Sequence, residues 1–174
     1  MFRKTLGVLG LFGGAATAGF LALTTTGLLQ SEDLRTKAYR DPVGIPTVCV
    51  GETKGVRMGD THTRQECLDM LQDRIVQFDK ELGRCIHVKV PEETRSAIVQ
   101  WGYNVGVGAA CKSTLVRKLN AGDTEGACNE LPRWVYATQT SKIAGKTVRK
   151  RITLPGLVTR RQHERNLCLA GIGK

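Results

Sequence analysis

Residues 5–29 carry no charged side chain, and this N-terminal stretch constrains the fate of the chain more than any other feature of the sequence. It follows Arg3 and Lys4 and reads TLGVLGLFGGAATAGFLALTTTGLL. A helix needs about 20 apolar residues to span a bilayer, so the stretch is long enough. Its many glycines and alanines and its three consecutive threonines make insertion only marginally favourable. Because basic residues precede the stretch, we expect the rest of the chain on the outer side of the membrane.

The same stretch fits either a signal-anchor or a cleaved signal peptide. Ala16, Thr17 and Ala18 supply a cleavage site of the A-x-A type. Against cleavage, the apolar character continues to Leu29, which a signal peptide does not require. We therefore predict a membrane segment over residues 1–30 and one compact domain over residues 31–174, a length that suits a single core.

Six cysteines are dispersed along this domain, with no C-x-x-C pair and no histidine-rich cluster. Behind an export signal, an even and dispersed set predicts disulfides in an oxidising compartment, and no metal site is expected. The pairing that we predict, although the sequence also permits others, is Cys49–Cys67, Cys111–Cys128 and Cys85–Cys168.

Apolar periodicity and capping residues predict an α+β domain that is mostly helical. Thr63 and Glu66 form a capping box ahead of a helix that should run to about residue 82. Further helices are expected over about residues 32–39 and from starts near residues 91, 113, 123 and 154–157. The segment 48–50 is β-prone and lies among glycines and prolines, which predicts a small antiparallel β element. Residues 141–151 are expected to form a polar loop or a small hairpin.

The charge is strongly basic, with a net value of +10. Much of the excess lies between residues 131 and 174, where Glu164 is the only acidic residue. Such an excess favours an anionic partner, although a solvated basic face remains an alternative. Nucleic acid is not the expected partner, because aromatic residues make up only 5% of the chain and no recognised binding motif occurs.

Two carboxylates follow the uncharged stretch directly. Glu32 is separated from Asp41 by eight residues, and Thr47 follows after a further five. Glycoside hydrolysis needs such a pair, one acid to protonate the leaving oxygen and one carboxylate to handle water or the sugar cation. On spacing alone, a helix cap and an Asp-Pro turn would be the better explanation of these residues.

The residues around this pair are more informative than the spacing alone. The segment EDLRTKAYRDPVGIPT, which includes Tyr39, resembles the catalytic signature of the phage lysozyme family, the family of the T-even phage lysozyme (glycoside hydrolase family 24). The later segments WGYNVG, STLVRKLNAGD and GLVTRRQHER resemble other parts of that family. The weakly apolar N-terminal stretch is similar to that of signal-anchor-release endolysins of lambdoid-type phages.

This resemblance implies a lysozyme-like fold and hydrolysis of the β-1,4 bond between N-acetylmuramic acid and N-acetylglucosamine in peptidoglycan. It implies Glu32 as general acid, Asp41 as the second carboxylate and Thr47 as a residue that positions water. Tyr39 would support the substrate, and Arg160 or Arg161 would lie near Glu32. It implies a monomer that needs no metal or cofactor, with peptidoglycan as its partner. The chain would first be held in the host inner membrane by residues 5–29 and then be released to the periplasm.

The sequence departs from the family pattern in two places. Asp33 stands where the family usually has glycine, and Glu52 stands where a histidine is common. Two other functions remain open at this point: a lytic transglycosylase, which can act with one glutamate, and a membrane-anchored cell-wall-binding protein without enzymatic activity.

Overall fold

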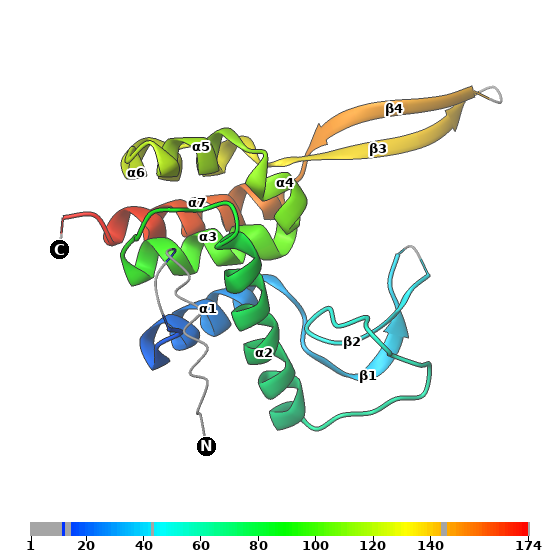
Figure 1. Ribbon diagram of the computed structural model, residues 1–174. Helices are drawn as coiled ribbons and strands as arrows, with labels where there is room; N and C mark the ends of the chain where they lie inside the picture. The colour runs from blue at the N-terminus through cyan, green and yellow to red at the C-terminus, as the bar shows by residue number, and fades with distance from the viewer. Residues whose placement is uncertain (1–11, 13–14, 43, 144–145, 174) are drawn as a thin grey trace, which may run out of the picture.

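The computed structural model describes residues 12, 15–42, 44–143 and 146–173. In this part of the chain, the helices form one body from which two separate β-hairpins extend (Figure 1). The elements in chain order are α1 (Ala18–Ser31), β1 (Arg35–Arg40), β2 (Pro46–Cys49), α2 (Arg64–Leu82), α3 (Glu92–Val105), α4 (Val107–Cys111), α5 (Thr114–Asn120), α6 (Thr124–Cys128), a 3-10 turn (Leu131–Arg133), β3 (Tyr136–Ile143), β4 (Lys146–Thr153) and α7 (Pro155–Ala170). The expected class, mostly helical with small antiparallel sheets, is confirmed.

The central element of the helical body is α3. Its residues 94–102 are all buried, as expected for a helix that is covered on every side. The helices α1, α2 and α7 pack around it, and Trp101 meets Trp134 edge to face, with the ring centroids 5.1 Å apart. Pro91 precedes α3 as the sequence predicts, and Glu92 and Glu93 in the first turn favour the positive end of the helix dipole.

The second half of the uncharged stretch forms α1 and is part of this core. Phe20, Thr24 and Leu28, spaced four residues apart, form its buried face against α3. Burial of a large apolar side chain contributes about 1.5–3 kcal/mol, so Phe20 and Leu28 stabilise the docked helix substantially. Residues 18–31 are thus packed on α3 as a helix, and a chain without residues 1–29 would lack most of it.

Small and polar residues on α1 fit the surface of α3. The Thr24 hydroxyl lies 3.0 Å from the hydroxyl of Ser96 in the buried interface. At Gly27, a Cβ atom would lie 2.1 Å from Oε1 of Gln100, a separation that only glycine avoids without displacing that side chain. The composition that makes the stretch a weak membrane span therefore also suits it to pack closely on α3.

The helix expected over residues 32–39 is wrong. Glu32 ends α1, and residues 35–40 form strand β1, which pairs antiparallel with β2. The reason is visible in the burial of β1, where exposed and half-buried side chains alternate at first as they do along a strand. The register shifts between Arg35 and Tyr39, and such an irregularity bends a strand.

The other predicted helix starts are confirmed by their caps. Thr63 and Glu66 form the reciprocal capping box ahead of α2. Ser113 and Asp123 accept backbone N–H groups at the starts of α5 and α6, and Pro155 opens α7.

All six cysteines are joined in disulfides, as predicted, but only one of the three predicted pairs is right. The bonds are Cys49–Cys67, Cys85–Cys111 and Cys128–Cys168. The predicted pairs Cys111–Cys128 and Cys85–Cys168 are wrong because α4 packs on α2, which places Cys111 against Cys85, and α6 packs on α7, which places Cys128 against Cys168. These partners depend on tertiary packing that sequence spacing does not reveal.

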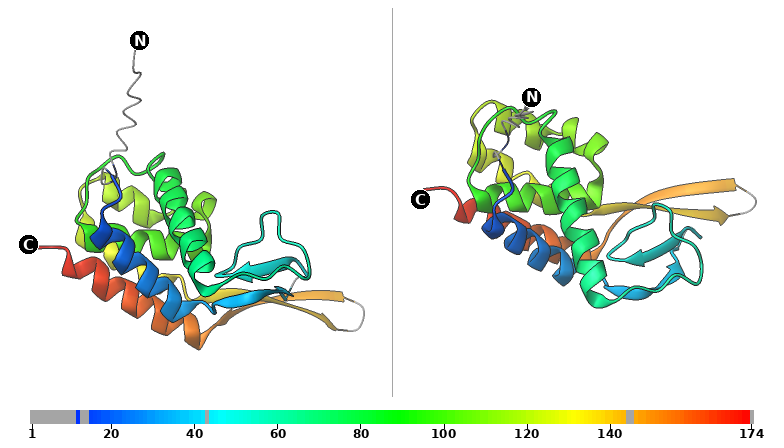
Figure 2. Two further views of the ribbon diagram at one scale, coloured as in Figure 1. Left: turned by 90° about the horizontal axis from the view of Figure 1, so that it is seen from below. Right: turned by 60° about the horizontal axis from the view of Figure 1, so that its bottom comes forward.

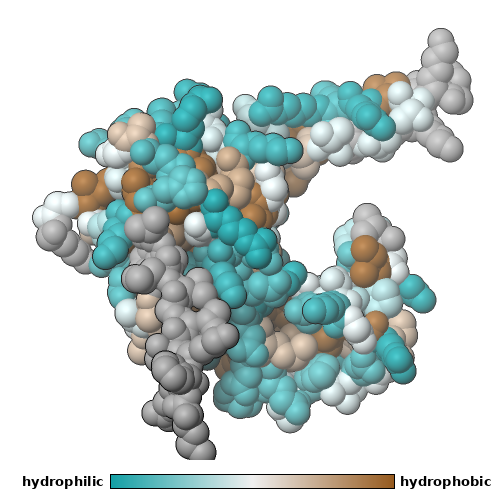
Figure 3. All heavy atoms as spheres, viewed as in Figure 1, coloured by the Kyte–Doolittle hydropathy of each residue, from teal (hydrophilic) through white to brown (hydrophobic). Residues whose placement is uncertain are grey.

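The strands β3 and β4 form a long hairpin that projects from the helical body (Figure 1). Two further views show that it extends toward the same side of the molecule as β1 and β2 (Figure 2). The space-filling view shows a hollow between the two projections (Figure 3). The sequence predicted a polar loop or a small hairpin over residues 141–151, and the observed hairpin is longer, with eight residues in each strand.

None of the helices in the described residues has the length and apolar character needed to cross a membrane. The segment expected to span the bilayer, residues 5–29, lies partly outside the described residues, since residues 5–11, 13 and 14 are not among them.

Candidate active site

Glu32 lies at the junction of α1 and β1 and is the C-cap of α1, where its backbone N–H donates to the carbonyl of Leu28. Its carboxylate accepts a hydrogen bond from the guanidinium of Arg160 on α7. The side chain of Arg160 is 8% exposed and that of Glu32 33% exposed. Glu32 is thus paired with the buried Arg160, while its carboxylate is still accessible from the surface.

Arg160 is itself held by two further acceptors. Its Nε donates to Oε1 of Glu164 over 3.2 Å, and its second terminal nitrogen lies 3.3 Å from the carbonyl oxygen of Gln100. Since all three guanidinium nitrogens are engaged, the orientation of Arg160 toward Glu32 is fixed. Of the two arginines expected near Glu32, the structure therefore places Arg160 in contact with it.

Arg161 points instead into the body. It is fully buried and donates to Oε1 of Glu164 over 2.8 Å. Burial raises the pKa of Glu164 to about 7, although the two guanidinium groups oppose this rise. Burial likewise lowers the pKa of Arg161 to about 10. Arg161 thus supports Glu164, which in turn supports Arg160.

Asp41 and Thr47 meet at one tight turn. The Asp41 N–H donates to the carbonyl of Ile45 over 3.0 Å, and the Ile45 N–H donates back to Oδ1 of Asp41 over 2.8 Å. The Thr47 hydroxyl donates to the same Ile45 carbonyl over 3.0 Å. Ile45 therefore joins the two residues, and Gly44 takes the left-handed conformation that lets the turn close.

The strand β1 connects Glu32 with this turn. Glu32 precedes the strand, Asp41 follows its last residue, and Tyr39 lies on it directly opposite Thr47. The guanidinium of Arg35 lies 4.3 Å from the centre of the Tyr39 ring, a cation–π contact. Because the strand bends at its register shift, its two ends lie closer together than those of a straight strand. Glu32, Tyr39 and Asp41 thus follow one another along or beside one bent strand, with Thr47 next to it on β2.

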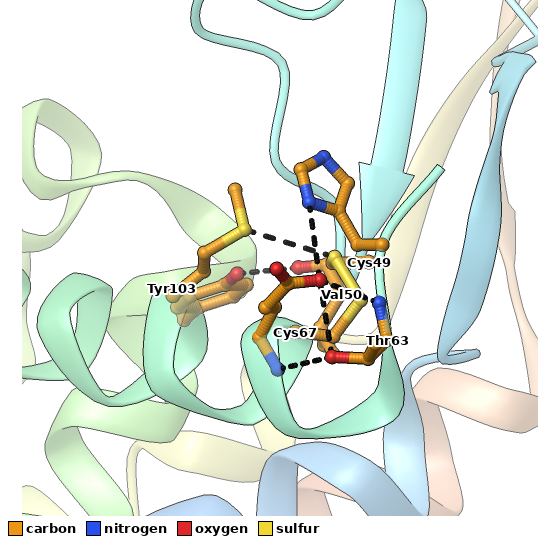
Figure 4. The surroundings of a disulfide bond; sticks show 8 residues. Cys49, Val50, Thr63, Cys67 and Tyr103 are labelled. Carbon is orange, nitrogen blue, oxygen red and sulfur yellow. Dashed lines mark hydrogen bonds and ion pairs between the residues drawn. A yellow bond between two sulfur atoms is a disulfide. The ribbon is translucent and has the colours of Figure 1, made fainter. Parts of the chain in front are cut away.

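The small β1–β2 sheet is linked to the helical body by the Cys49–Cys67 disulfide and by contacts beside it (Figure 4). There the Tyr103 hydroxyl on α3 donates to the carbonyl oxygen of Val50 over 2.6 Å. Burial, and secondarily the charge of Glu32, raises the pKa of Tyr103 to about 12, so its hydroxyl stays protonated and the bond persists at all physiological pH values.

Glu52, at the position where the resemblance leads one to expect histidine, has a structural part in the same sheet. Its Oε1 accepts the backbone N–H groups of Thr53 and Lys54 over 2.9 and 2.7 Å, and Arg74 of α2 lies 4.0 Å from its other oxygen. An acceptor that closes a turn and faces a cation needs a carboxylate, which accounts for the glutamate at this position.

An open groove of about 800 Å³ lies beside the Glu32–Arg160 pair, between the end of α1 and the start of α7. Its lining residues come from these two helices and from the link that joins β4 to α7: Gln30, Ser31, Leu154, Pro155, Gly156, Leu157, Thr159, Arg160 and His163. Within the described part of the chain, no three His, Cys, Asp or Glu side chains gather in a way that could hold a metal ion.

Sequence reasoning missed Glu164 as a supporting residue, although a signal for it was present. It is the only acidic residue between positions 131 and 174, and it follows Arg160 and Arg161 at four and three residues. On a helix these spacings place the three side chains on one face. A lone carboxylate within a basic helix is therefore a sign of a paired, buried charge.

Comparison with known proteins agrees with this geometry. Residues 29–164 match the family described as Phage lysozyme. The chain is 40% identical over 161 residues to a protein named SAR-endolysin of Bacteriophage PS119, covering 91% of this chain and 89% of the relative. Among solved structures, it resembles an endolysin from Escherichia coli O157:H7 phage FAHEc1, with a TM-score of 0.71, 26% identity and coverage of 92% and 98%. It also resembles a point mutant of P22 lysozyme, with a TM-score of 0.68, 28% identity and coverage of 88% and 97%.

Proposed function

Because the chain belongs to the phage lysozyme family and is a phage endolysin, a glycoside hydrolase that lyses the host through its peptidoglycan, we propose that Glu32 is its general acid. The observation that carries this proposal is the contact of Glu32 with the buried and fully engaged Arg160. An acid that protonates a glycosidic oxygen must be held in one orientation, because proton transfer requires hydrogen-bond distance to the leaving atom. Arg160 is the positioning residue that supplies this orientation.

Asp41 is the second carboxylate in this proposal. It either activates a water molecule or stabilises the positive charge that develops on the sugar. The Thr47 hydroxyl donates its proton to Ile45, so its lone pairs remain able to accept a hydrogen bond from that water. Because Thr47 is only 3% exposed, it would bind a water molecule and stabilise the turn, and it would not contact a sugar ring.

The glycan strand would lie along β1, in the hollow between the two projections (Figure 3). Glu32 and Asp41 must flank the same glycosidic bond to act on it, which the bend of the strand between them favours. The bond cleaved is the β-1,4 bond between N-acetylmuramic acid and N-acetylglucosamine. Tyr39, between the two carboxylates and under Arg35, supports a sugar ring of the bound strand.

The products of the reaction test this assignment against a lytic transglycosylase. Digestion of purified peptidoglycan should release muropeptides that end in a reducing N-acetylmuramic acid, which mass spectrometry identifies by the added water. Products that end in 1,6-anhydro-N-acetylmuramic acid would instead assign the transglycosylase reaction. An Asp41→Asn variant that keeps full activity would point to the same alternative.

We also propose that the chain is held in the inner membrane by residues 5–29 before it acts, as the name of the Bacteriophage PS119 relative suggests. On release, residues 18–31 fold onto α3 as helix α1 and place Glu32 at the start of β1. While the segment remains in the bilayer, this packing cannot form, and Glu32 cannot meet Arg160. Membrane release and assembly of the site are then one event.

A pair of substitutions on the exposed side of α1 tests this proposal. Ala22 and Thr26 are exposed in the folded domain, so leucine at both positions should leave the core intact. Each leucine favours membrane insertion by about 0.5 kcal/mol. The Ala22→Leu/Thr26→Leu variant should therefore move to the membrane fraction and delay lysis, whereas Ala22→Gln/Thr26→Gln should release earlier. Recovery of a shortened mature chain that begins near Gly19 would show cleavage and contradict the proposal.

A further inference from the structure

The β3–β4 hairpin is the most one-sidedly charged element of the described chain. Its two strands pair in register over all eight positions of each strand. Residues 136–153 include no acidic residue and five basic residues, namely Lys142, Lys146, Arg149, Lys150 and Arg151. An isolated hairpin of two strands is only marginally stable, and like charges along it make it less so. Such a charge pattern needs a reason outside the stability of the fold.

The register sorts the described side chains onto two different faces, since directly opposed residues share a face. One face, called here the Thr/Arg face, also includes Lys142 by its register, and its described side chains are all exposed and, with one exception, threonine or arginine: Tyr136, Thr138, Thr140, Thr147, Arg149, Arg151 and Thr153. The other face is more apolar and includes Ala137, Val148, Lys150 and Ile152. The Thr/Arg face is therefore a surface of hydrogen-bond donors.

Arg151 is already arranged for binding at the base of this face. Its guanidinium lies 3.8 Å from the centre of the Tyr136 ring, so it is stacked while its N–H groups still point outward in the plane of the group. Arg149 lies two residues along the same strand face, about 7 Å away. Two such guanidinium groups fit carboxylates, which arginine binds through two parallel hydrogen bonds.

The hairpin stands next to the candidate active site. Its base is closed by the Leu154 N–H, which donates to the Val135 carbonyl over 3.0 Å, and Pro155 then opens α7. Arg160, the partner of Glu32, lies only seven residues beyond Thr153 on this helix. The hairpin and the small β1–β2 sheet project on the same side of the molecule, with the hollow between them (Figures 2 and 3). A strand bound in that hollow would therefore pass beside the hairpin.

We propose that the Thr/Arg face of the β3–β4 hairpin binds the carboxylates of the stem peptides on the glycan strand that occupies the active site, an inference that rests on the proposed function. The sugar backbone of peptidoglycan offers hydroxyl and acetamido groups, whereas its stem peptides end in free carboxylates. Guanidinium groups flanked by threonine hydroxyls match these peptides in both charge and hydrogen bonding. An anionic lipid surface would be matched better by an apolar face that can enter the bilayer, so the hydrogen-bonding character of this face favours the peptide.

The test compares wild type, a hairpin variant and a control variant on two substrates. The Arg149→Gln/Arg151→Gln variant should raise KM for intact sacculi about tenfold and leave kcat unchanged. On sacculi whose carboxylates have been converted to neutral methylamides, wild type should show the same high KM, and the variant should show no further loss. The matched control, Arg84→Gln/Lys89→Gln, removes two exposed cations from the helical body and should match wild type on both substrates.

Several results would overturn the proposal. The proposal is wrong if the hairpin variant has an unchanged KM for intact sacculi. It is also wrong if the substitutions raise KM equally on blocked sacculi, or if the control variant shows the same rise in KM. If the hairpin variant loses binding to vesicles of phosphatidylglycerol and keeps its KM for sacculi, the hairpin binds a lipid surface instead. If wild type cleaves neither substrate, the proposed function fails, which is a different outcome from a failure of the hairpin proposal alone.

Discussion

Replacement of Glu32 with glutamine should lower the rate of peptidoglycan hydrolysis by about 10²–10⁴-fold, because the amide cannot donate the proton that the leaving oxygen needs. Glutamine keeps the length of the side chain and an oxygen that accepts the hydrogen bond from Arg160, so the fold should be retained. The measurement is the fall in turbidity of permeabilised Gram-negative cells, with the variant and wild type at equal concentration.

The neighbouring residue provides the control for this variant. Asp33 is exposed and pairs with Arg35 over 3.2 Å, an interaction between surface groups that is worth little. Asp33→Asn removes the same charge one residue further along and should keep its activity within about twofold of wild type. A Glu32→Gln protein that still lyses cells at the wild-type rate would contradict the assignment and favour a wall-binding role without catalysis.

The parts of the fold that the sequence predicts are those with local causes. Thr63 and Glu66 satisfy each other's backbone groups within one turn. Pro91 favours the start of α3 because its ring fixes φ and it has no N–H that needs a partner. The placement of Asp41 beside Thr47 follows in the same way from a turn of a few residues. In such cases the contacting residues are only a few positions apart in the sequence, so their spacing is enough to predict the contact.

The features that the sequence does not predict depend on partners far along the chain. Strand β1 forms because β2 offers it an edge, although its residues alone could have continued a helix. Cys85 and Cys128 find their partners through the packing of α4 on α2 and of α6 on α7. The role of Arg160 rather than Arg161 depends on the direction in which α7 faces α1. Burial and orientation of this kind arise only when the helices have docked.

The helix α1 adds a different difficulty, because its sequence resembles a membrane segment while its residues pack in the core. It carries no charged residue, as expected of a membrane segment, and its Phe20 and Leu28 are buried against α3. A pattern that fits both cannot reveal from sequence alone that residues 18–31 belong to the folded domain. The polar contact of Thr24 with Ser96 is the feature that a membrane span would not need.

A buried ion pair beside α1 fastens three helices together. The side chain of Arg95 on α3 is 2% exposed, and its Nε and one terminal nitrogen donate to the two carboxylate oxygens of Asp79 on α2 over 2.7 and 2.6 Å. The guanidinium carbon also lies 4.3 Å from the centre of the Phe20 ring on α1, and a terminal nitrogen lies 3.3 Å from the Ala15 carbonyl oxygen ahead of that helix. Arg95 therefore connects α1 to both of its neighbours.

Replacement of Asp79 with alanine should lower the free energy of unfolding by about 3–5 kcal/mol, because it leaves the buried guanidinium of Arg95 without its countercharge. Urea denaturation of the released protein, followed by circular dichroism, measures this loss. The control is Asp73→Ala on the same helix, where the carboxylate is exposed and the expected loss is below about 0.5 kcal/mol. Since Arg95 also holds Phe20, the Asp79→Ala protein should dock α1 less firmly, so a larger share of the chains should remain in the membrane fraction. Equal stability of the two variants would mean that water reaches Arg95 and that the pair does not fasten α1, whereas a large loss of stability without any change in membrane fraction would separate folding of the body from release of the segment.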